Sequence, residues 1–122
     1  MTENRPRGNR IDDLFELLSD SHRRATIHLL ARRERPIGVE QLAERIASQT
    51  WDDPSHEDVR RMHISLQHTH LPKLDDADVV ECDFDAQRVE FTNWRPIEEG
   101  WQEARSWFER LDESSQHRSE TP

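Results

Sequence analysis

Two short alternating segments joined by a tight polar turn constrain this chain more than any other feature. Apolar side chains occupy alternate positions on both sides of the turn. They are Val80, Cys82 and Phe84 in the first segment, which begins with a further apolar residue, Val79, and Val89 and Phe91 in the second. The connection is Asp85-Ala86-Gln87, and aspartate tolerates the backbone geometry of tight turns. Residues 79–92 are therefore predicted to form one β-hairpin.

Four helices are predicted before the hairpin, because apolar residues there recur three and four positions apart. The expected ranges are 11–19, 21–34, 39–48 and a fourth helix that starts near His56. The expected inward residues are Ile11, Leu14, Phe15 and Leu18; Ile27, Leu30 and Ala31; Val39, Leu42, Ala43 and Ile46; and Val59, Met62, Leu66 and Thr69.

The boundaries of these helices carry their own signals. Asp20 or Ser21 is expected to cap the second helix, and Ser55-x-x-Asp58 fits a capping box for the fourth. Pro36-Ile37 reads as an extended link and residues 49–56 as a loop. Pro72 is expected to end or bend the fourth helix, since proline lacks an amide hydrogen.

Helices followed by one hairpin predict a mainly α protein with a small β-hairpin, arranged as a winged helix-turn-helix with an additional C-terminal helix. We expect a flexible arm over 1–10, a winged-helix domain over 11–93, a C-terminal helix over 94–111 and a disordered tail over 112–122. A winged helix-turn-helix mostly docks one helix in a DNA groove, which makes duplex DNA the expected partner.

The charge balance bears on that partner. The formal net charge is −9, and of the 17 basic residues only Lys73 is a lysine. Such an acidic composition, nearly free of lysine, resembles proteins of salt-loving archaea. At ~1 M salt the Debye length is only about 3 Å, and counterion release loses most of its driving force. The negative charge therefore weakens the DNA hypothesis without excluding it.

Other classes of function find little support in the sequence. Three scattered glycines provide no phosphate-binding loop, and no cluster of carboxylates lies in an apolar setting that would raise a pKa, so we predict neither an enzyme nor a cofactor. His56, His63 and His70 are seven residues apart, about 10 Å along a helix, so no metal site is predicted. The single Cys82, the polar N-terminus and the lack of a long apolar run favour a cytoplasmic protein without a membrane span.

One family resemblance rests on particular motifs: Asp13-Leu14-Phe15-x-x-Leu18-Ser19-Asp20, Arg23-Arg24, Leu42-Ala43-x-x-Ile46 and Ser65-Leu66-x-x-Thr69-His70-Leu71-Pro72-Lys73-Leu74. With these motifs the chain resembles a haloarchaeal winged-helix family of uncharacterised function. It is more distantly similar to ArsR-type and MarR-type repressors, in which Ala-Gly-Leu-Val follows a helix ending in His-Leu-x-x-Leu. Asp78 stands here at the position of that glycine, and aspartate is one of the few residues that tolerate a positive φ.

The resemblance implies that the fourth helix is the recognition helix. The base-facing candidates are Arg60, Arg61, Ile64, Ser65, Gln67 and His68, and the phosphate-contacting candidates are Lys73 and Arg88. Arginine can bind guanine in a bidentate manner and glutamine can pair with adenine. His70 is expected to be a structural hydrogen-bonding residue at the helix end. The competing interpretation of the outward residues is an ordinary solvated helix face. Asp83 and Asp85 would repel phosphate, and Glu57 and Asp58 lie at the helix start, where bases are often read.

Two further segments have alternative interpretations. Arg5, Arg7 and Arg10 fit either an arm that contacts DNA or a solvated terminus. Ile97, Trp101, Ala104, Phe108 and Leu111 alternate spacings of four and three along the last helix, with Trp107 beside them. This seam either folds back on the first helix or pairs two chains, and we expect a homodimer. A non-enzymatic protein-protein interaction module that does not bind DNA is the alternative function.

Overall fold

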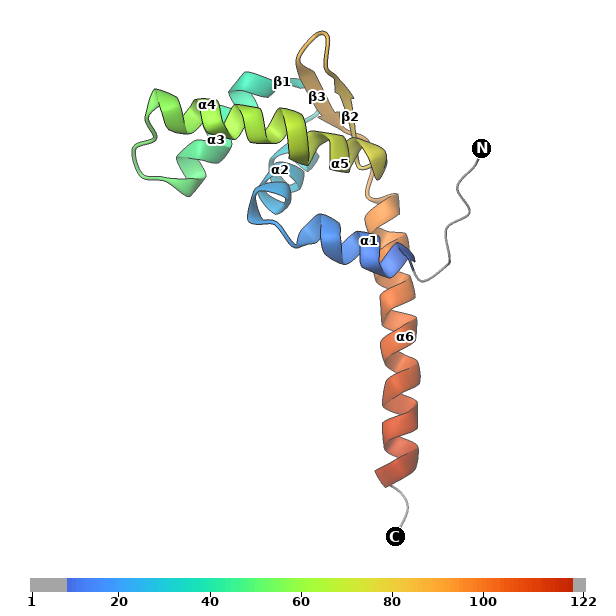
Figure 1. The fold of residues 1–122 in the computed structure, drawn as a ribbon. Helices are drawn as coiled ribbons and strands as arrows, with labels where there is room; N and C mark the ends of the chain where they lie inside the picture. Colours follow the sequence, from blue (N-terminus) through green and yellow to red (C-terminus); the bar gives the residue numbers. More distant parts are fainter. Residues whose placement is uncertain (1–8, 120–122) are drawn as a thin grey trace.

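The computed structural model describes residues 9–119, and it consists mainly of helices with one small sheet (Figure 1). The helical elements are α1 (Asn9–Leu18), α2 (Ser21–Ala31), α3 (Val39–Thr50), α4 (His56–Ser65), the π-helical turn η1 (Leu66–His70), α5 (Leu71–Asp76) and α6 (Arg95–Ser119). The strands are β1 (Ile37–Gly38), β2 (Val80–Asp83) and β3 (Arg88–Phe91). The predicted fold class is confirmed: helices, a small hairpin and a C-terminal helix follow one another in a winged-helix-like order.

The sheet has three antiparallel strands in the order β1-β3-β2. Val89 in the central strand pairs with Ile37 on one side and with Cys82 on the other. The expected extended link at Pro36-Ile37 is thus partly a strand. Two residues are too few to show alternation in the sequence, so pairing with the hairpin is what defines β1.

One apolar core joins the helices to the sheet. Its buried members come from every element between α1 and β3, and they include Leu17, Ile27, Leu30, Ile37, Val39, Leu42, Ile46, Met62, Leu66, Leu71, Leu74, Val79, Val80 and Val89. One expectation for the first helix was wrong, and one of its buried residues was not predicted. Phe15 is 49% exposed, whereas Leu17 is buried. The inward side of α1 is set by Leu14 and Leu17, which lie three positions apart on one face.

Pro72 was expected to end or bend the fourth helix, and it does not end it. The helix passes through the π turn η1 and continues as α5, where Pro72 lies within the first turn. Proline is tolerated there because the first amides of a helical turn need no partner within it. A π turn inserts one extra residue into the helix. The inward positions therefore shift by one, so that Thr69 is exposed and His70 is buried.

Among the residues that the structure describes, two other than glycine adopt a positive φ, one directly before the hairpin and one in its turn. Asp78, at 62°, turns the chain from α5 into β2, as expected for the position where glycine stands in similar proteins. Gln87, at 54°, closes the hairpin turn. Left-handed backbone costs roughly 1–2 kcal/mol for residues with a β-carbon, so both turns are held in place by surrounding contacts.

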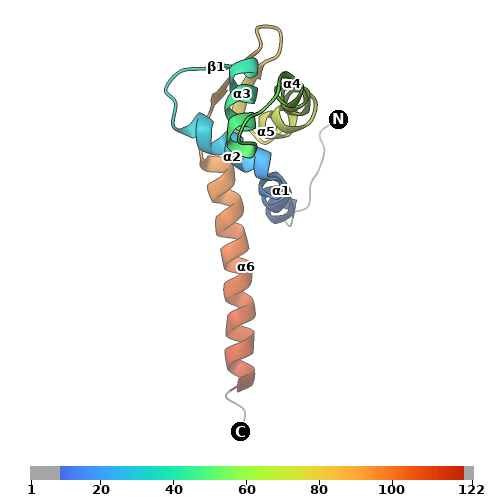
Figure 2. The same cartoon turned by 90° about the vertical axis from the view of Figure 1, so that its left-hand side faces the viewer.

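The last helix, α6, packs by its first half against α1, and its second half projects away from the rest of the molecule (Figures 1 and 2). Gly100 makes this packing close: a β-carbon at that position would lie 3.0 Å from Leu14 Cβ. Ala104, one turn further, is fully buried. The helix runs to Ser119, beyond the expected end at 111, because residues 112–119 contain neither glycine nor proline.

Most of the expected N-terminal arm, including Arg5 and Arg7, lies outside the described residues. Arg10 belongs to the first turn of α1 and is exposed. Among the helices that the structure describes, none is long and apolar enough to cross a bilayer.

Candidate nucleic-acid interface

The start of α4 is fixed by its own sequence. Ser55 Oγ accepts a hydrogen bond from the amide of Asp58 at 3.1 Å, and Asp58 Oδ2 accepts one from the amide of Ser55 at 3.0 Å. The predicted capping box is confirmed. These bonds hold the pKa of Asp58 below its ordinary value. The carboxylate of Asp58, which sequence analysis counted against DNA binding, thus has a structural role in the helix cap.

The outward face of α4 carries most of the expected base-facing side chains. Arg60, Arg61 and His68 are exposed, and Ile64 is 48% exposed. Arg61 Nε lies 3.5 Å from Glu57 Oε1, an exposed ion pair of the kind that contributes little to stability. The guanidinium can therefore exchange Glu57 for another anion at small cost.

Ser65 and Gln67 are less accessible than the other residues expected to face bases, since both are half-buried. They lie at the junction with η1, where the extra residue of the π turn begins to rotate the outward face. The accessible row therefore consists mainly of Arg60, Arg61 and Ile64, with His68 on the π turn beyond them.

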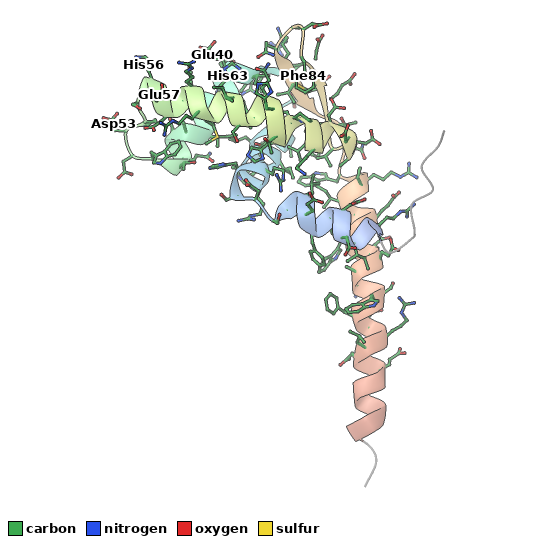
Figure 3. The ribbon with its side chains drawn as sticks, in the orientation of Figure 1. Glu40, Asp53, His56, Glu57, His63 and Phe84 are labelled. Carbon is green, nitrogen blue, oxygen red and sulfur yellow. The ribbon has the colours of Figure 1, made fainter. Side chains whose placement is uncertain are left out.

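A side-chain hydrogen bond joins the hairpin to α4. His63 Nε2 lies 3.1 Å from Gln87 Oε1, and Gln87 also donates from Nε2 to the carbonyl of Phe84 at 2.8 Å. The carbonyl of Gln87 accepts the amide hydrogen of Val39, the first residue of α3, at 2.9 Å. Figure 3 shows His63 on α4 beside the hairpin that carries Phe84. Gln87 thus connects the hairpin to both helices of the helix-turn-helix, a role that sequence analysis missed.

The two residues expected to contact phosphate differ in their surroundings. Arg88 is exposed on β3, directly after Gln87, and lies on the hairpin that flanks α4. Lys73 points toward α1, where its Nζ lies 2.8 Å from Glu16 Oε1. That hydrogen bond and the lysine charge lower the pKa of Glu16. Lys73 therefore links α5 to α1 and would have to leave Glu16 to reach a phosphate.

Acidic residues border the same region. A groove between α3 and α4 is lined by Glu40, Glu44 and Asp53 together with His56, Arg60 and His63. Figure 3 shows His56 and Glu57 at the N-terminal end of α4 and Glu40 nearby. In the hairpin, Asp83 Oδ1 accepts the amide hydrogen of Ala86 at 3.0 Å and so shapes the turn. The outward face of α4 is thus of mixed charge, not uniformly basic.

A buried polar contact supports the far end of the same helix. Arg23 is 5% exposed, and it donates from Nε to the carbonyl of Leu17 at 2.9 Å and from Nη2 to that of Glu16 at 2.7 Å. Its Nη1 lies 3.2 Å from His70 Nδ1. Guanidinium groups only donate, so His70 accepts at Nδ1, and its expected structural role is confirmed. Burial lowers the pKa of His70, and the charge of Arg23 acts in the same direction against the opposing carboxylate of Asp20.

The residues expected to pair two chains divide into two groups along α6. Ala104 is fully buried within the chain and Ile97 is half-buried against the core, so neither belongs to an open seam. Trp101 (56% exposed), Phe108 (53%) and Leu111 (47%) remain accessible. Trp107 packs edge-to-face on Phe108 at 5.0 Å between ring centroids. The first half of the helix thus completes the monomer, and the aromatic residues leave a second surface open.

These features define a small, mainly helical domain with a winged-helix-like layout and an extended C-terminal helix. A family model described as a domain of unknown function, DUF7344, matches residues 15–90. The match spans more than half of the chain, from α1 to the central strand, and the chain belongs to this family. No curated protein and no solved structure matches the chain.

Proposed function

We propose that this protein is a DNA-binding transcriptional regulator that uses a winged helix-turn-helix. The observation that carries the proposal is the exposed row of Arg60, Arg61 and Ile64 on α4, beside a hairpin that exposes Arg88 directly after its turn. In this arrangement α4 enters the major groove, and the hairpin contacts the adjacent backbone.

The chemistry of the row suits the edges of bases. Each arginine can donate two parallel hydrogen bonds to a guanine, and the apolar side chain of Ile64 can contact a thymine methyl group. His68 extends the row by one turn. Arg88 supplies a phosphate contact that fixes the register of the domain on the duplex. Lys73 takes part only if its ion pair with Glu16 opens.

The net charge of −9 and the acidic groove beside α4 imply that this contact works at high salt. At about 1 M salt the Debye length is about 3 Å, so Glu40 and Glu44 repel phosphate only at close contact. We therefore propose that the protein works in the cytoplasm of a salt-loving archaeon. Recognition there depends on hydrogen bonds and shape, because counterion release contributes little.

The proposal is tested by fluorescence anisotropy with a library of genomic DNA fragments in about 1–2 M potassium chloride, where screening is nearly complete. We expect the wild-type protein to select particular fragments. Replacing both arginines (Arg60→Ala plus Arg61→Ala) should weaken this binding by at least about tenfold, since a good bidentate contact contributes roughly 1–3 kcal/mol.

A matched control removes the same charge elsewhere. Arg32 and Arg35 are exposed in the connection between α2 and β1, which lies on the far side of α3 from α4 (Figure 2). The Arg32→Ala plus Arg35→Ala variant should bind DNA like the wild type. Equal binding by both double variants, or no selected fragment at all, would exclude α4 as a recognition helix.

The proposed regulator is a homodimer that pairs through the projecting half of α6. Phe108 and Leu111 expose apolar area on the projecting half of α6, and Trp101 exposes more beside the half that packs on α1. We expect a dimer mass in light scattering after size exclusion. Phe108→Ser plus Leu111→Ser should give a monomer, whereas the exposed neighbours Glu109→Ser plus Arg110→Ser should leave the dimer intact.

A second candidate function is a protein-protein interaction module of the same fold that does not bind DNA. The same exposed aromatic residues favour it, because a partner protein could cover them in place of a second copy. A protein that is monomeric and selects no DNA fragment in the two experiments above would favour this function.

A further inference from the structure

Asp20 and His22 at the start of α2 meet His70, which comes from a distant part of the chain, at the junction of α1, α2 and η1. Asp20 Oδ1 lies 3.9 Å from His70 Nε2 and 4.0 Å from His22 Nδ1. One ligand atom from each of the three residues lies within 4.8 Å of the others. The two rings meet edge to face, with 5.9 Å between their centroids. We propose that Asp20, His22 and His70 bind a divalent transition metal ion of the zinc type.

The donor set selects this class of ion. Imidazole nitrogens bind zinc, cobalt and nickel well, whereas magnesium and calcium take oxygen ligands almost alone. Three protein ligands leave a fourth position for water. The side chains of Asp20 and His22 are 37% and 30% exposed, and that of His70 is 5% exposed. An ion can therefore enter from solvent and bind against one fixed, buried ring.

The fold prepares each ligand separately. Asp20 is the N-cap of α2, and its Oδ1 accepts the amide hydrogens of His22 and Arg23. Although burial raises the pKa of Asp20, these hydrogen bonds keep it below its ordinary value, so the carboxylate is charged. A carboxylate accepts in about four directions, which makes capping compatible with metal binding. His70 reaches the junction only because η1 turns it inward.

Metal binding requires the three ligand atoms to move slightly closer together. Zinc–ligand bonds of about 2.0–2.1 Å place tetrahedral ligands roughly 3.3 Å apart, which is closer than the present separations. Asp20 and His22 are the partly exposed members, so their side chains can rotate toward His70. The buried ring need not move.

Arg23 sets the proton balance of the site. Because Arg23 donates to His70 Nδ1, the ring carries its proton on Nε2 when no metal is bound. A metal ion at Nε2 displaces that proton, and Nδ1 takes one up, so the ring stays neutral. The new Nδ1–H then faces an N–H of Arg23 Nη1 at the present 3.2 Å, so Nη1 must turn away from the ring. The guanidinium keeps the carbonyls of Glu16 and Leu17 as acceptors. Its positive charge opposes the ion and lowers the affinity.

The test is calorimetric titration of the full chain with Zn²⁺, with Co²⁺ absorption as a second readout of coordination. We expect one ion per chain. His22→Ala removes a ligand, and Asp20→Asn removes the carboxylate while retaining an N-cap side chain. Each variant should bind at least about tenfold more weakly, the lower end of what even outer-shell changes cost at metal sites. His28→Ala, an exposed histidine on the same helix, should bind like the wild type.

A spectroscopic result separates this site from adventitious binding at other histidines. In ¹⁵N spectra of the imidazole rings, Zn²⁺ should convert Nδ1 of His70 from the acceptor to the protonated form. Absence of Zn²⁺ binding by the wild type, undiminished binding by both ligand variants, or an unchanged His70 tautomer would each overturn the site. None of these outcomes bears on Arg60 and Arg61, so the proposed DNA contact is tested independently.

Discussion

His63 on α4 and Gln87 in the hairpin turn are joined by a 3.1 Å contact between Nε2 and Oε1. The two residues are 24 positions apart, and Gln87 holds a positive φ of 54° at its place in the turn. This side-chain contact therefore sets how the hairpin lies against the proposed recognition helix.

A double-mutant cycle should measure that coupling. We expect His63→Ala and Gln87→Ala each to lower the free energy of unfolding, with a coupling of about 0.5–1.5 kcal/mol, the usual net contribution of one hydrogen bond. Urea unfolding of the four proteins provides the values. The cycle of His56→Ala with Gln87→Ala is the control, since His56 lies at the far end of α4, and strict additivity of His63 and Gln87 would contradict the contact.

Substitutions of Asp78 should change the stability of the protein in an order that follows from the backbone geometry at this position. At φ 62°, Asp78→Gly should be at least as stable as the wild type, because glycine adopts a left-handed conformation without steric cost. Asp78→Val should lose about 1–2 kcal/mol, since a β-branched residue fits that conformation poorly. Thermal unfolding of the three proteins checks this order. A valine variant as stable as the wild type would mean that the turn does not need a positive φ.

Gly100 should resist a substitution that normally strengthens helices. Alanine in place of glycine stabilises a helix interior by about 1 kcal/mol. At position 100 its β-carbon would meet Leu14 Cβ at 3.0 Å and the carbonyl of Arg10 at 3.3 Å. Overpacking of this kind costs about 1–3 kcal/mol, so we expect Gly100→Ala to lower the free energy of unfolding.

Gly38→Ala is the matched control for that substitution. Its β-carbon would find only the carbonyl of Gln87, at 3.9 Å, and φ at Gly38 is −66°. This variant should be neutral or slightly more stable in denaturant unfolding. If Gly100→Ala were stabilising, the close packing of α6 on α1 would be refuted.

The capping box of α4 should make part of the stability depend on pH. Hydrogen bonds with Ser55 hold the pKa of Asp58 below its ordinary 3.8. A lowered carboxyl pKa contributes stability above the ordinary value, and this contribution is lost as pH falls through the lowered value. Between about pH 5 and pH 3, Asp58→Asn should therefore show a smaller decline in unfolding free energy than the wild type.

Ser55→Ala tests the other half of the box. It should cost about 1 kcal/mol at neutral pH, whereas Ser48→Ala on the exposed side of α3 should cost little. An identical acid decline in the wild type and in Asp58→Asn would show that the box does not form in solution.

Cys82 should react slowly with thiol reagents. It is half-buried on β2, and burial, with the nearby carboxylates of Asp75 and Asp83, raises its pKa to about 11. The thiolate is the reactive form, so alkylation by iodoacetamide at pH 8 should be roughly 100-fold slower in the folded protein than in urea. A folded-state rate near that of the unfolded chain would contradict the burial.

Elements with strong periodicity could be predicted from the sequence, and elements defined by a partner could not. The apolar stripe of Leu42 and Ile46 and the Ser55 capping signal are local, and both were confirmed. Strand β1 exists only because Ile37 pairs with Val89. In α1, the choice of Leu17 over Phe15 as the buried residue depends on the elements packed against it, which no local pattern records.

The candidate sites show the same division. Exposure of Arg60 and Arg61 follows from the helical period alone. The contact of Arg23 with His70 spans 47 positions. Both residues belong to motifs that the sequence shows, but nothing in the neighbouring residues predicts that they meet. Asp20 could be predicted as a helix cap, but its approach to His70 depends on the π turn.

That turn makes α4, η1 and α5 a single rod with an internal change of phase. In a regular helix, residues seven positions apart lie on the same side. Across the π turn such residues differ in direction by roughly a quarter of a revolution, since each residue turns a helix by about 100°. His56 and His63 share the groove side, whereas His70, seven further on, faces Arg23. Deleting one residue between Leu66 and His70 would restore the regular count and leave Leu71 and Leu74 facing the core, because the π turn absorbs one extra residue.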